Sequence, residues 1–486
     1  MMKPKNTLLA LLTTAALAGC ALGPDYERPA LPEAKHLAPA EVESAMRAQG
    51  QVTDAELPAQ WWTLYQSPAL DQLVHDALAH NPSVPAAQAA LRAAAETRLA
   101  QQASFFPTVT ASYNGARQRV ATALASPLAS GANVFNVGTA QLSVAYTPDV
   151  FGANRRQVES LAAQEQAQRW NLEATYLTLS TNVVVAAIEE AGLTAQIEAT
   201  RQQITLQADL VERYRKLREL GQNSELDLAQ QEAQLASLQS SLPPLQKQLA
   251  LTRDQLKALA GVLPDDTLAA SFTLDQLHLP EPLPLTLPSS LVEHRPDVLA
   301  AEAQAHSAAA DVGVAIANRL PTVTLGVDSW GSSAASLTRL FASGSNFWTL
   351  AGGVTQTVFD GGALGHRSEA AKAAYEQAVA SYRSTVINAF QNVADALQGL
   401  QADTAAEQAA QRQLATAQRA FNIAKRQLEL GDTSAVAVIQ AEQSQQQALA
   451  TLVQARATHL SDAAVLIQAL GGGWWSRPPE TASASH

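Results

Sequence analysis

Long stretches of the chain have the residue pattern of α-helix and little that interrupts it. Residues 156–220 contain no proline, and the one glycine there, Gly192, lies among strong helix formers. At ~1.5 Å per residue a helix of this length extends ~100 Å, which is more than one globular domain needs. Leu220 and Gly221 predict its end, because glycine adopts the left-handed C-cap conformation most easily.

A second helix is predicted to return after Ser224, a candidate N-cap, with Asp227 as the acidic half of a capping box. Two sets of positions then recur every seven residues and are mostly apolar. They are Leu228, Leu235, Leu242, Leu249 and Leu256, and Gln231, Leu238, Leu245, Thr252 and Leu259. This period is typical of a coiled-coil seam. Pro243 and Pro244 are expected to kink or split the helix.

Two segments before the long helix alternate between apolar and polar residues, which is the period of a β-strand. They lie at 107–115 and 140–147, on either side of a loop of small and polar residues. Such alternation suits a half-buried strand. It equally suits a strand of a membrane barrel, with lipid on one side and water on the other.

Short motifs of the first half recur in the second half in the same order. The matched pairs are Asn81-Pro82 with Arg295-Pro296, residues 106–110 with 320–324, residues 150–152 with 358–361, and Leu220-Gly221 with Leu430-Gly431. The first two pairs share an offset of 214 residues, so the helix between them has one length in both halves. A unit of helix, strand, loop, strand, long helix, turn and return helix is therefore duplicated. The second copy predicts strands around 323–327 and 348–354.

The N-terminus predicts a targeting segment, with Lys3 and Lys5 before an apolar core at 8–18. Leu-Ala-Gly-Cys at 17–20 resembles a bacterial lipoprotein signal, in which Cys20 is lipidated and becomes the first residue. The alternative is an ordinary secretory signal with a chance cysteine. Several acyl chains on Cys20 give stable anchoring, whereas a single chain is marginal.

These patterns divide the chain into six segments. They are a lipoprotein signal peptide (1–19), a lipidated N-terminal arm (20–66), a first repeat (67–261), a linker (262–288), a second repeat (289–471) and a C-terminal tail (472–486). Residues 22–58 are rich in proline and alanine and predict an extended arm. Trp61 and Trp62 are expected to anchor a core. Ser67 before Pro68 predicts the start of a helix.

Composition excludes several classes of function. The formal net charge of −12 makes a nucleic-acid partner implausible. One cysteine leaves no intrachain disulfide, and the nine histidines show no metal-ligand spacing. The serines lie in caps or loops rather than in a nucleophile turn, so we expect no enzyme, no cofactor and no metal. An apolar run of ~20 residues is absent, which predicts no transmembrane helix.

Four strands cannot close a membrane barrel, and open sheet edges are not tolerated in hydrocarbon. Three copies supply twelve strands, which is within the range of outer-membrane barrels. We therefore expect an α+β membrane protein. Its outer-membrane β-barrel, with four strands per chain and twelve per trimer, is continuous with a long periplasmic helical coiled-coil barrel.

The chain resembles the TolC-like outer-membrane efflux factors, in particular the lipoprotein subgroup called NodT-type. The resemblance covers nearly the whole mature chain. It is carried by Cys20, Gly-Pro-Asp-Tyr-Glu-Arg-Pro at 23–29, Trp61-Trp62, Arg295-Pro296-Asp297 with Ala301-Glu302, and Val-Phe-Asp-Gly-Gly at 358–362.

The resemblance implies a homotrimeric, passive exit duct of a tripartite efflux pump for drugs and toxic organic compounds. It implies a periplasmic adaptor, a proton-driven inner-membrane pump and outer-membrane lipid as partners. It also implies a periplasmic constriction at the two hairpin turns, for which Glu225, Asp227 and Asp432 are candidates. Gln440 stands where many relatives carry aspartate, so the constriction is expected to be less charged. Asp227 acting only as a helix cap is the competing interpretation.

Other functions stay open on the sequence alone. A duct for protein secretion or for metal-ion export has the same fold, although secretion ducts usually lack the lipidated cysteine. A trimeric coiled-coil stalk accounts for the heptads and leaves the duplicated strand pairs unexplained.

Overall fold

The computed structural model of the chain describes residues 22–30, 40–48, 50, 52–53, 56–121, 123, 131–267, 271–280, 282–284 and 293–477. The chain divides into two compact units, each of which combines segments from both sequence repeats. Unit 1 contains Met1–Pro29, Leu91–Gln168 and Ala301–Tyr382, and unit 2 contains Ala30–Ala90, Arg169–Ala300 and Arg383–His486.

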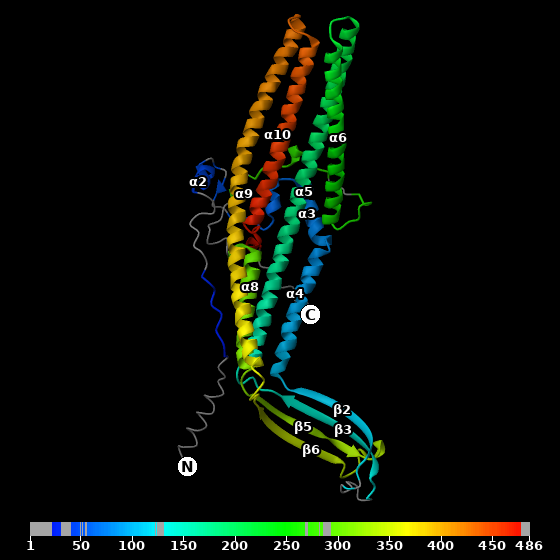
Figure 1. Ribbon diagram of the computed structural model, residues 1–486, viewed down its shortest axis with the longest axis vertical. Helices are drawn as coiled ribbons and strands as arrows, with labels where there is room; N and C mark the ends of the chain where they lie inside the picture. The colour runs from blue at the N-terminus through cyan, green and yellow to red at the C-terminus, as the bar shows by residue number, and fades with distance from the viewer. Residues whose placement is uncertain are drawn as a thin grey trace. The chain divides into compact units, whose positions relative to one another are not determined.

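The helices and strands follow the order drawn in Figure 1. The helices are α2 (Ala40–Ala48), α3 (Pro68–His80), α4 (Ser83–Gln102), α5 (Ala153–Glu219), α6 (Glu225–Leu259), α8 (Pro296–Ala317), α9 (Ala363–Leu430) and α10 (Ala435–Ala469). Short 3-10 helices lie at Trp61–Tyr65, Ala103–Phe105, Leu274–Gln276, Leu337–Arg339 and Trp474–Ser476. The strands are β1 (Val52–Thr53), β2 (Thr108–Arg119), β3 (Val134–Tyr146), β4 (Leu283–Pro284), β5 (Thr322–Ala334) and β6 (Asn346–Thr355).

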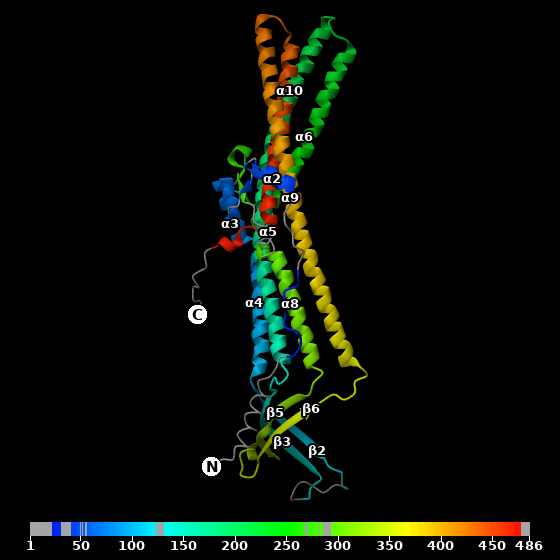
Figure 2. The same ribbon diagram turned by 90° about the vertical axis from the view of Figure 1, so that its left-hand side faces the viewer.

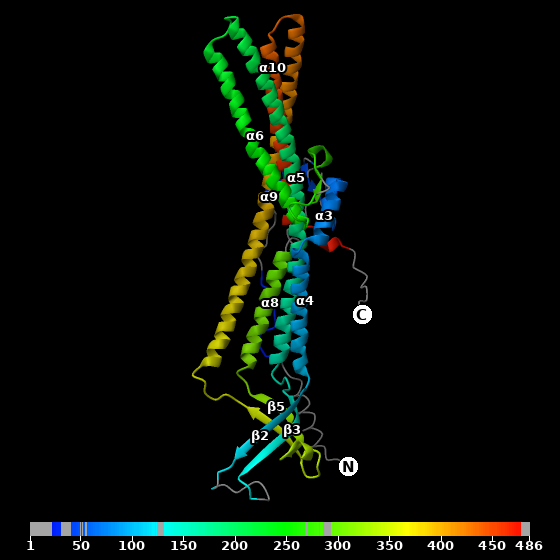
Figure 3. The same ribbon diagram turned by 90° about the vertical axis from the view of Figure 1, so that its right-hand side faces the viewer.

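Two helical hairpins, α5 with α6 and α9 with α10, form much of unit 2, and their turns lie at the same end of that unit (Figures 2 and 3). The predicted seam of α6 is confirmed, since each of its ten positions is buried or half-buried. Leucines outside the seam are exposed, with Leu226 at 66 % and Leu251 at 59 %. The seven-residue period thus identified which leucines pack and which face solvent.

Gln231 occupies an otherwise apolar seam position and is satisfied there by hydrogen bonds. Gln207 of α5 is 1 % exposed, and its Nε2 donates to the Gln231 carbonyl oxygen at 2.9 Å and to its Oε1 at 3.2 Å. Gln443 of α10 donates to Gln207 Oε1 at 2.6 Å. A polar pairing of this kind fixes the register of three helices, because a slipped register leaves buried amides unpaired.

Two expectations for this part of the chain are corrected. Of the kink or split expected at Pro243 and Pro244, the split is wrong, because the return helix runs unbroken through both residues as α6. The proline-rich arm is not extended throughout, because Ala40–Ala48 forms α2. Its sequence, Ala-Glu-Val-Glu-Ser-Ala-Met-Arg-Ala, consists mostly of good helix formers, and local propensity prevails over the surrounding prolines.

Unit 1 contains a four-stranded antiparallel sheet in the order β2-β3-β5-β6. All four predicted strands are confirmed, and β2 and β3 extend further toward the loop than their apolar alternation indicated. The β3–β5 pairing joins the first repeat to the second. Among the described residues, β2 and β6 each pair with one neighbour, so both outer edges are open.

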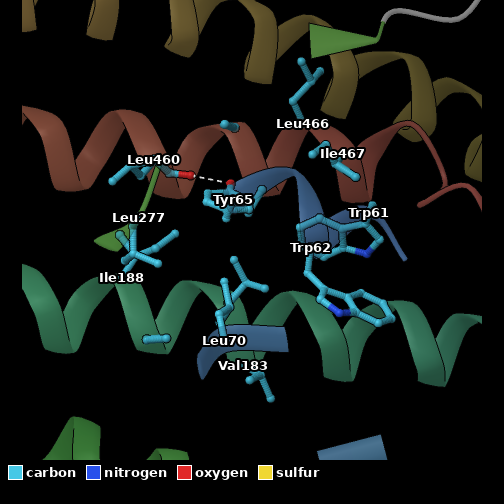
Figure 4. Close-up of a cluster of buried hydrophobic side chains, with 14 of the residues drawn as sticks. Trp61, Trp62, Tyr65, Leu70, Val183, Ile188, Leu277, Leu460, Leu466 and Ile467 are labelled. Atoms are coloured by element: carbon cyan, nitrogen blue, oxygen red, sulfur yellow. Dashed lines mark hydrogen bonds between the residues drawn. The ribbon is translucent and has the colours of Figure 1, made fainter. Parts of the chain in front are cut away.

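The main core of unit 2 surrounds the paired tryptophans, which confirms their predicted anchoring role (Figure 4). Trp61 and Trp62 are 1 % and 6 % exposed, and the buried Tyr65 hydroxyl donates to the Leu460 carbonyl at 2.8 Å. Phe272 and Leu277 bring the proline-rich linker into this core. None of the described helices combines the length and apolar character that crossing a bilayer requires.

Candidate functional site

The sheet of unit 1 has one apolar face and one polar face. Residues directly opposite each other share a face, so the register divides the half of the sheet nearest the helices into these two faces. Toward the loops the division breaks down, because Arg117 and Asn136 lie on the apolar face and Phe135 and Phe347 on the polar face. The apolar face carries Val109, Ala111, Tyr113, Ala140, Leu142, Val144, Tyr146, Val323, Leu325, Val327, Trp330, Trp348, Leu350 and Val354. The polar face carries Thr108, Thr110, Ser112, Asn114, Thr139, Gln141, Ser143, Thr322, Thr324 and Thr349.

Both faces of this sheet are open among the described residues, and several large apolar side chains of the apolar face are strongly exposed. Trp348, Leu350 and Val354 are 73 %, 71 % and 70 % exposed, and Val109 is 64 % exposed. A continuous apolar patch of this kind marks a surface that contacts a membrane or another protein. The exposed indoles and phenol rings suit a bilayer interface, where one edge of the ring is apolar and the other is hydrated.

The first hairpin turn is closed by glycine and by a capping box. Gly221 has φ +72°, and the Gln222 N–H donates to the Leu217 carbonyl at 2.8 Å. The Ser224 side chain accepts from the Asp227 N–H at 3.1 Å, while Asp227 Oδ2 accepts from the Ser224 N–H at 3.0 Å and its hydroxyl at 2.7 Å. These bonds lower the pKa of Asp227. Asp227 is therefore a helix cap, whatever else it does.

The other acidic candidates, Glu225 and Asp432, differ in the interactions of their carboxylates. Glu225 is paired with Arg218 of α5 at 2.7 Å across the first turn. The second turn repeats the glycine, with Gly431 at φ +81°, and Ser434 caps α10. Its aspartate, Asp432, is exposed, and no hydrogen bond or ion pair of its carboxylate is found within the described part of the chain. Gln440, on the first turns of α10, is also exposed.

The Arg-Pro-Asp motif joins the start of α8 to the end of α10. Arg295 is 8 % exposed and donates to the carbonyl of Ala469, the last residue of α10, at 2.8 Å. Its other nitrogens donate to both oxygens of Asp297, at 3.0 and 2.7 Å. Pro296 opens the helix, where its missing N–H is not needed. The motif supplies a hydrogen bond to a helix end whose carbonyls lack partners within the helix.

The first repeat makes the same junction with a different side chain. Asn81, the counterpart of Arg295, donates from Nδ2 to the carbonyl of Leu259, the last residue of α6, at 2.9 Å. We call the contacts of Asn81 with Leu259 and of Arg295 with Ala469 the two clasps. Neither role is visible in sequence, because the partners are 178 and 174 residues apart.

A glycine with positive φ completes each clasp. A Cβ on Gly261 (φ +76°) would lie 2.5 Å from the His80 carbonyl oxygen, and one on Gly471 (φ +101°) 2.8 Å from that of His294. Only glycine allows so close an approach of two backbones. The duplication seen in sequence therefore extends to backbone contacts.

The described part of the N-terminal arm is bound to unit 1 by the Gly-Pro-Asp-Tyr-Glu-Arg-Pro motif. Asp25 accepts from the buried Arg156 of α5 at 2.6 Å. The Tyr26 ring stacks on His306 with centroids 4.4 Å apart, and Arg28 pairs with Glu302 at 2.8 Å. Arg156 was not foreseen, since nothing in sequence links an arginine on a long helix to an acid 131 residues before it. Cys20, which precedes this motif, lies outside the described residues.

Two facing carboxylates in unit 2 form a titratable pair. Burial, with the carboxyl of Asp462 on α10 beside it, raises the pKa of Asp403 on α9 to about 6, and nearby His459 opposes the shift. His459 is itself paired with Glu407 at 2.8 Å. Asp403 Oδ2 is buried and has no partner among the described residues. Protonation of Asp403 removes the cost of burying a charged oxygen at this position.

We expect this pair to make stability fall as pH rises. The unfolded pKa of aspartate is about 3.9, so the folded chain holds the proton more tightly than the unfolded chain between pH ~4 and 6. The resulting stabilisation is complete below pH ~4 and lost as pH passes 6. Asp462→Asn removes the like charge and should flatten the pH dependence of the unfolding midpoint. Asp395→Asn, an exposed site on α9, is the control, and parallel curves for wild type and Asp462→Asn would contradict the assignment.

Within the residues that the structure describes, no three or more histidine, cysteine, aspartate or glutamate side chains come together as metal ligands.

Comparison with known proteins relates this architecture to outer-membrane channels. The family described as "Outer membrane efflux protein" matches residues 73–262 and 287–472. The toluene efflux pump outer membrane protein TtgC of Pseudomonas putida is 30 % identical, over 97 % of this chain and 96 % of its own. The pyoverdine export outer membrane protein OpmQ of the same species is 28 % identical, over 87 % and 90 %.

Solved structures agree. The outer-membrane channel OprN superposes with a TM-score of 0.83 at 26 % identity, covering 94 % of this chain and all of that one. The outer membrane protein VceC of Vibrio cholerae gives 0.76 at 28 % identity, covering 86 % and 99 %.

Proposed function

Because this chain belongs to the outer membrane efflux protein family, we propose that it is the exit duct of a tripartite efflux pump, a passive channel for small organic molecules. The sheet of unit 1 is the observation that carries the proposal. It exposes an apolar face to its surroundings and turns threonine, serine, asparagine and glutamine to the other side. That division suits a barrel wall with lipid outside and water inside.

The open edges of the sheet support a trimer. A strand edge in hydrocarbon leaves backbone N–H and C=O groups unpaired, and each such group costs several kcal/mol. Four strands are too few to close on themselves, whereas twelve from three chains form a barrel with a lumen. The helical hairpins of unit 2, with the buried seam of α6, suit the coiled-coil part of such a duct.

A passive duct needs partners that select and drive the substrate. We infer a periplasmic adaptor and a proton-driven inner-membrane pump, in line with the family resemblance and with relatives named as outer-membrane proteins of efflux pumps. Relatives named for toluene efflux and pyoverdine export support small organic molecules as the cargo class. We infer no catalytic activity, because the family is one of channels.

The membrane location includes a lipid anchor in our proposal. Leu-Ala-Gly-Cys at 17–20 supports acylation of Cys20, and the arm that follows is bound to unit 1 through Asp25 and Arg28. We expect mass spectrometry of the mature N-terminus to find Cys20 carrying acyl chains. An unmodified terminus at another residue would refute the anchor. Cys20→Ser should alter processing and leave membrane insertion of the sheet intact.

We place the periplasmic constriction at the two hairpin turns, with Asp432 as its main charge. Asp432 is exposed and has no hydrogen bond or ion pair of its carboxylate among the described residues, whereas Asp227 is engaged in its cap and Glu225 in an ion pair. Gln440 adds a neutral polar group. Three copies of Asp432 around one axis attract cations and repel anions.

Native mass spectrometry and bilayer recording test the proposal. Protein extracted from the outer membrane is expected to contain three chains and to produce discrete conductance steps in a planar bilayer. Particles that contain one or two chains, or trimers that never conduct, would contradict the proposal of a trimeric duct.

A further inference from the structure

The strands of the unit 1 sheet all have their helix connections at one end (Figure 1). The chain enters β2 from α4 and leaves β3 into α5, and the same order recurs with α8, β5, β6 and α9. At the opposite end β2 and β5 finish, and β3 and β6 begin. We call this end, at Arg119, Val134, Ala334 and Asn346, the outer end. In the proposed duct the helices lie on the periplasmic side, so the outer end reaches the outer leaflet of the membrane.

Charge in this part of the chain is sparse and mostly positive. Residues 108–146, which contain β2 and β3, include two arginines and no lysine, aspartate or glutamate. Residues 322–355, which contain β5 and β6, include Arg339 and Asp328 as their only charged residues. Three arginines against one aspartate give a formal charge of +2, in a chain whose net charge is −12. The strands and their connections are therefore a basic region of an acidic protein.

The two arginines of the first strand pair lie at the outer end, on the same face as the exposed apolar side chains. Arg117 and Arg119 follow Tyr113 of that face by four and six residues on β2. Residues an even number apart on a strand point to the same side of the sheet. Both arginines are exposed, and neither guanidinium has a hydrogen bond or ion pair among the described residues.

Tyr113 indicates where the apolar part of this face ends. Its ring lies over the two glycines of the next row, because a Cβ on Gly115 would lie 3.5 Å from the Tyr113 hydroxyl oxygen and one on Gly138 would lie 3.1 Å from it. The hydroxyl therefore points toward the outer end and Arg117. A tyrosine in this orientation suits a bilayer interface, with its ring in the apolar layer and its hydroxyl among the headgroups.

The arginines then lie at the level of the lipid headgroups. At ~3.4 Å per residue, Arg117 is ~14 Å beyond Tyr113 along the strand. At the ~40° tilt of barrel strands this is ~10 Å along the membrane normal. The outer leaflet of an outer membrane consists of a glycolipid whose sugars carry phosphates. A guanidinium binds phosphate through two parallel hydrogen bonds, and such charge-assisted pairs are stronger than neutral ones.

We propose that Arg117 and Arg119 bind the phosphate groups of lipid A, the phosphorylated glycolipid of the outer leaflet, at the outward face of the sheet. This rests on the proposed duct, which sets the outer end of the sheet in that leaflet. The charge of the surface is complementary to that of the lipid. Residues 120–133, which follow on the chain, contain no acidic residue that could compete for the guanidinium groups.

Lipid retention by the extracted protein tests the proposal. The probe is lipid A, and lipid A stripped of its phosphates is the comparison. Native mass spectrometry in detergent counts the lipid molecules that each variant retains. Arg117→Gln/Arg119→Gln should weaken the binding of lipid A about tenfold or more, because each position loses a charge-assisted pair with phosphate. The dephosphorylated lipid should bind wild type and this variant equally.

Matched variants separate the site from net charge. Arg117→Gln/Gln118→Arg keeps the charge and moves it to the other face, so it should bind lipid A as weakly as Arg117→Gln alone. Arg92→Gln/Arg412→Gln removes two exposed arginines from helices and should bind as wild type does. Equal retention of lipid A by wild type and Arg117→Gln/Arg119→Gln would overturn the site. An equal loss in the helical variant would overturn it too, because net charge alone would then account for the binding.

Two further probes identify the source of the phosphate. Phosphatidylglycerol, a phospholipid with one phosphate, should be retained less than lipid A. Inorganic phosphate at the concentration of the lipid should not displace lipid A. If phosphatidylglycerol is retained as well as lipid A, or if inorganic phosphate displaces it, the assignment to lipid A is wrong.

Failure of this site and failure of the proposed duct can be distinguished. Arg117→Gln/Arg119→Gln should remain a trimer with the conductance steps of wild type, because neither exposed side chain contributes to a core. Wild-type protein found as single chains that do not conduct would contradict the duct itself. Conducting trimers that retain lipid A equally with and without the two arginines would remove the lipid site and leave the duct in place.

Discussion

Gly261→Ala is expected to destabilise the folded chain by about 3 kcal/mol or more, among the larger effects of a single substitution. The new Cβ would lie 2.5 Å from the His80 carbonyl oxygen, and the atom it meets is backbone rather than a flexible side chain. The end of α6 and the α3–α4 junction must then separate, which breaks the Asn81–Leu259 clasp. The midpoint of chemical unfolding, followed by the helical signal in detergent, measures the loss.

Gly221→Ala is the matched control, because both glycines end long helices with nearly the same positive φ. Gly221 has φ +72°, and an added Cβ there meets nothing within 4 Å. The Gly221→Ala variant is therefore destabilised only by the strain of an alanine in the left-handed conformation, about 1–2 kcal/mol. Gly471→Ala and Gly431→Ala repeat the comparison in the second half. If Gly261→Ala and Gly221→Ala lose the same stability, backbone strain alone accounts for both and the close approach is unimportant.

Asp227→Asn combined with Asp432→Asn is expected to abolish most of the cation selectivity of the reconstituted channel. Asp432 should contribute most of the change, since its carboxylate has no partner in the described part of the chain while that of Asp227 accepts two bonds from Ser224. The difference between wild type and variant should shrink with added salt, because the Debye length falls from ~10 Å at 0.1 M to ~3 Å at 1 M. Reversal potentials across a salt gradient measure it.

Single variants separate the charge from the cap. Asp227→Asn alone should lower thermal stability and leave cation selectivity nearly intact. Asp432→Asn alone should lower cation selectivity and leave thermal stability nearly intact. Asp395→Asn removes one negative charge per chain far along α9 and serves as the control for net charge. Unchanged selectivity in the double variant, with only stability reduced, would mean that the constriction lies elsewhere.

Local regularities made much of the fold predictable. The heptad leucines of α6, Ser224 as its cap, and Gly221 at the end of α5 all follow from residues within one or two turns. The four strands were recognised because alternation needs only neighbouring residues. The duplication then supplied the second half, including the strands at Val323 and Trp348.

Contacts between distant segments could not be predicted in this way. The resemblance identified the candidates for the charge ring by position, and Ser224 already indicated that Asp227 caps a helix. The structure adds that the Asp432 carboxylate has no hydrogen bond or ion pair among the described residues. The buried pair of Arg156 with Asp25 and the facing carboxyls of Asp403 and Asp462 depend on which helix faces meet. Helix α2 was missed for a different reason, since nine residues among prolines give too short a window for a period.

The two clasps have a consequence for how the halves of this chain diverged after duplication. Asn81 and Arg295 differ in size, charge and number of donors, yet each reaches the last carbonyl of its return helix. Both halves carry glycine at the equivalent positions, Gly261 and Gly471. Any other residue would add a Cβ too close to the facing backbone. After duplication the side chain that donates the hydrogen bond could therefore change, while the close approach of the two backbones at the glycine was retained. In such a protein common descent is recorded less by matching side chains than by the few places where a side chain is forbidden.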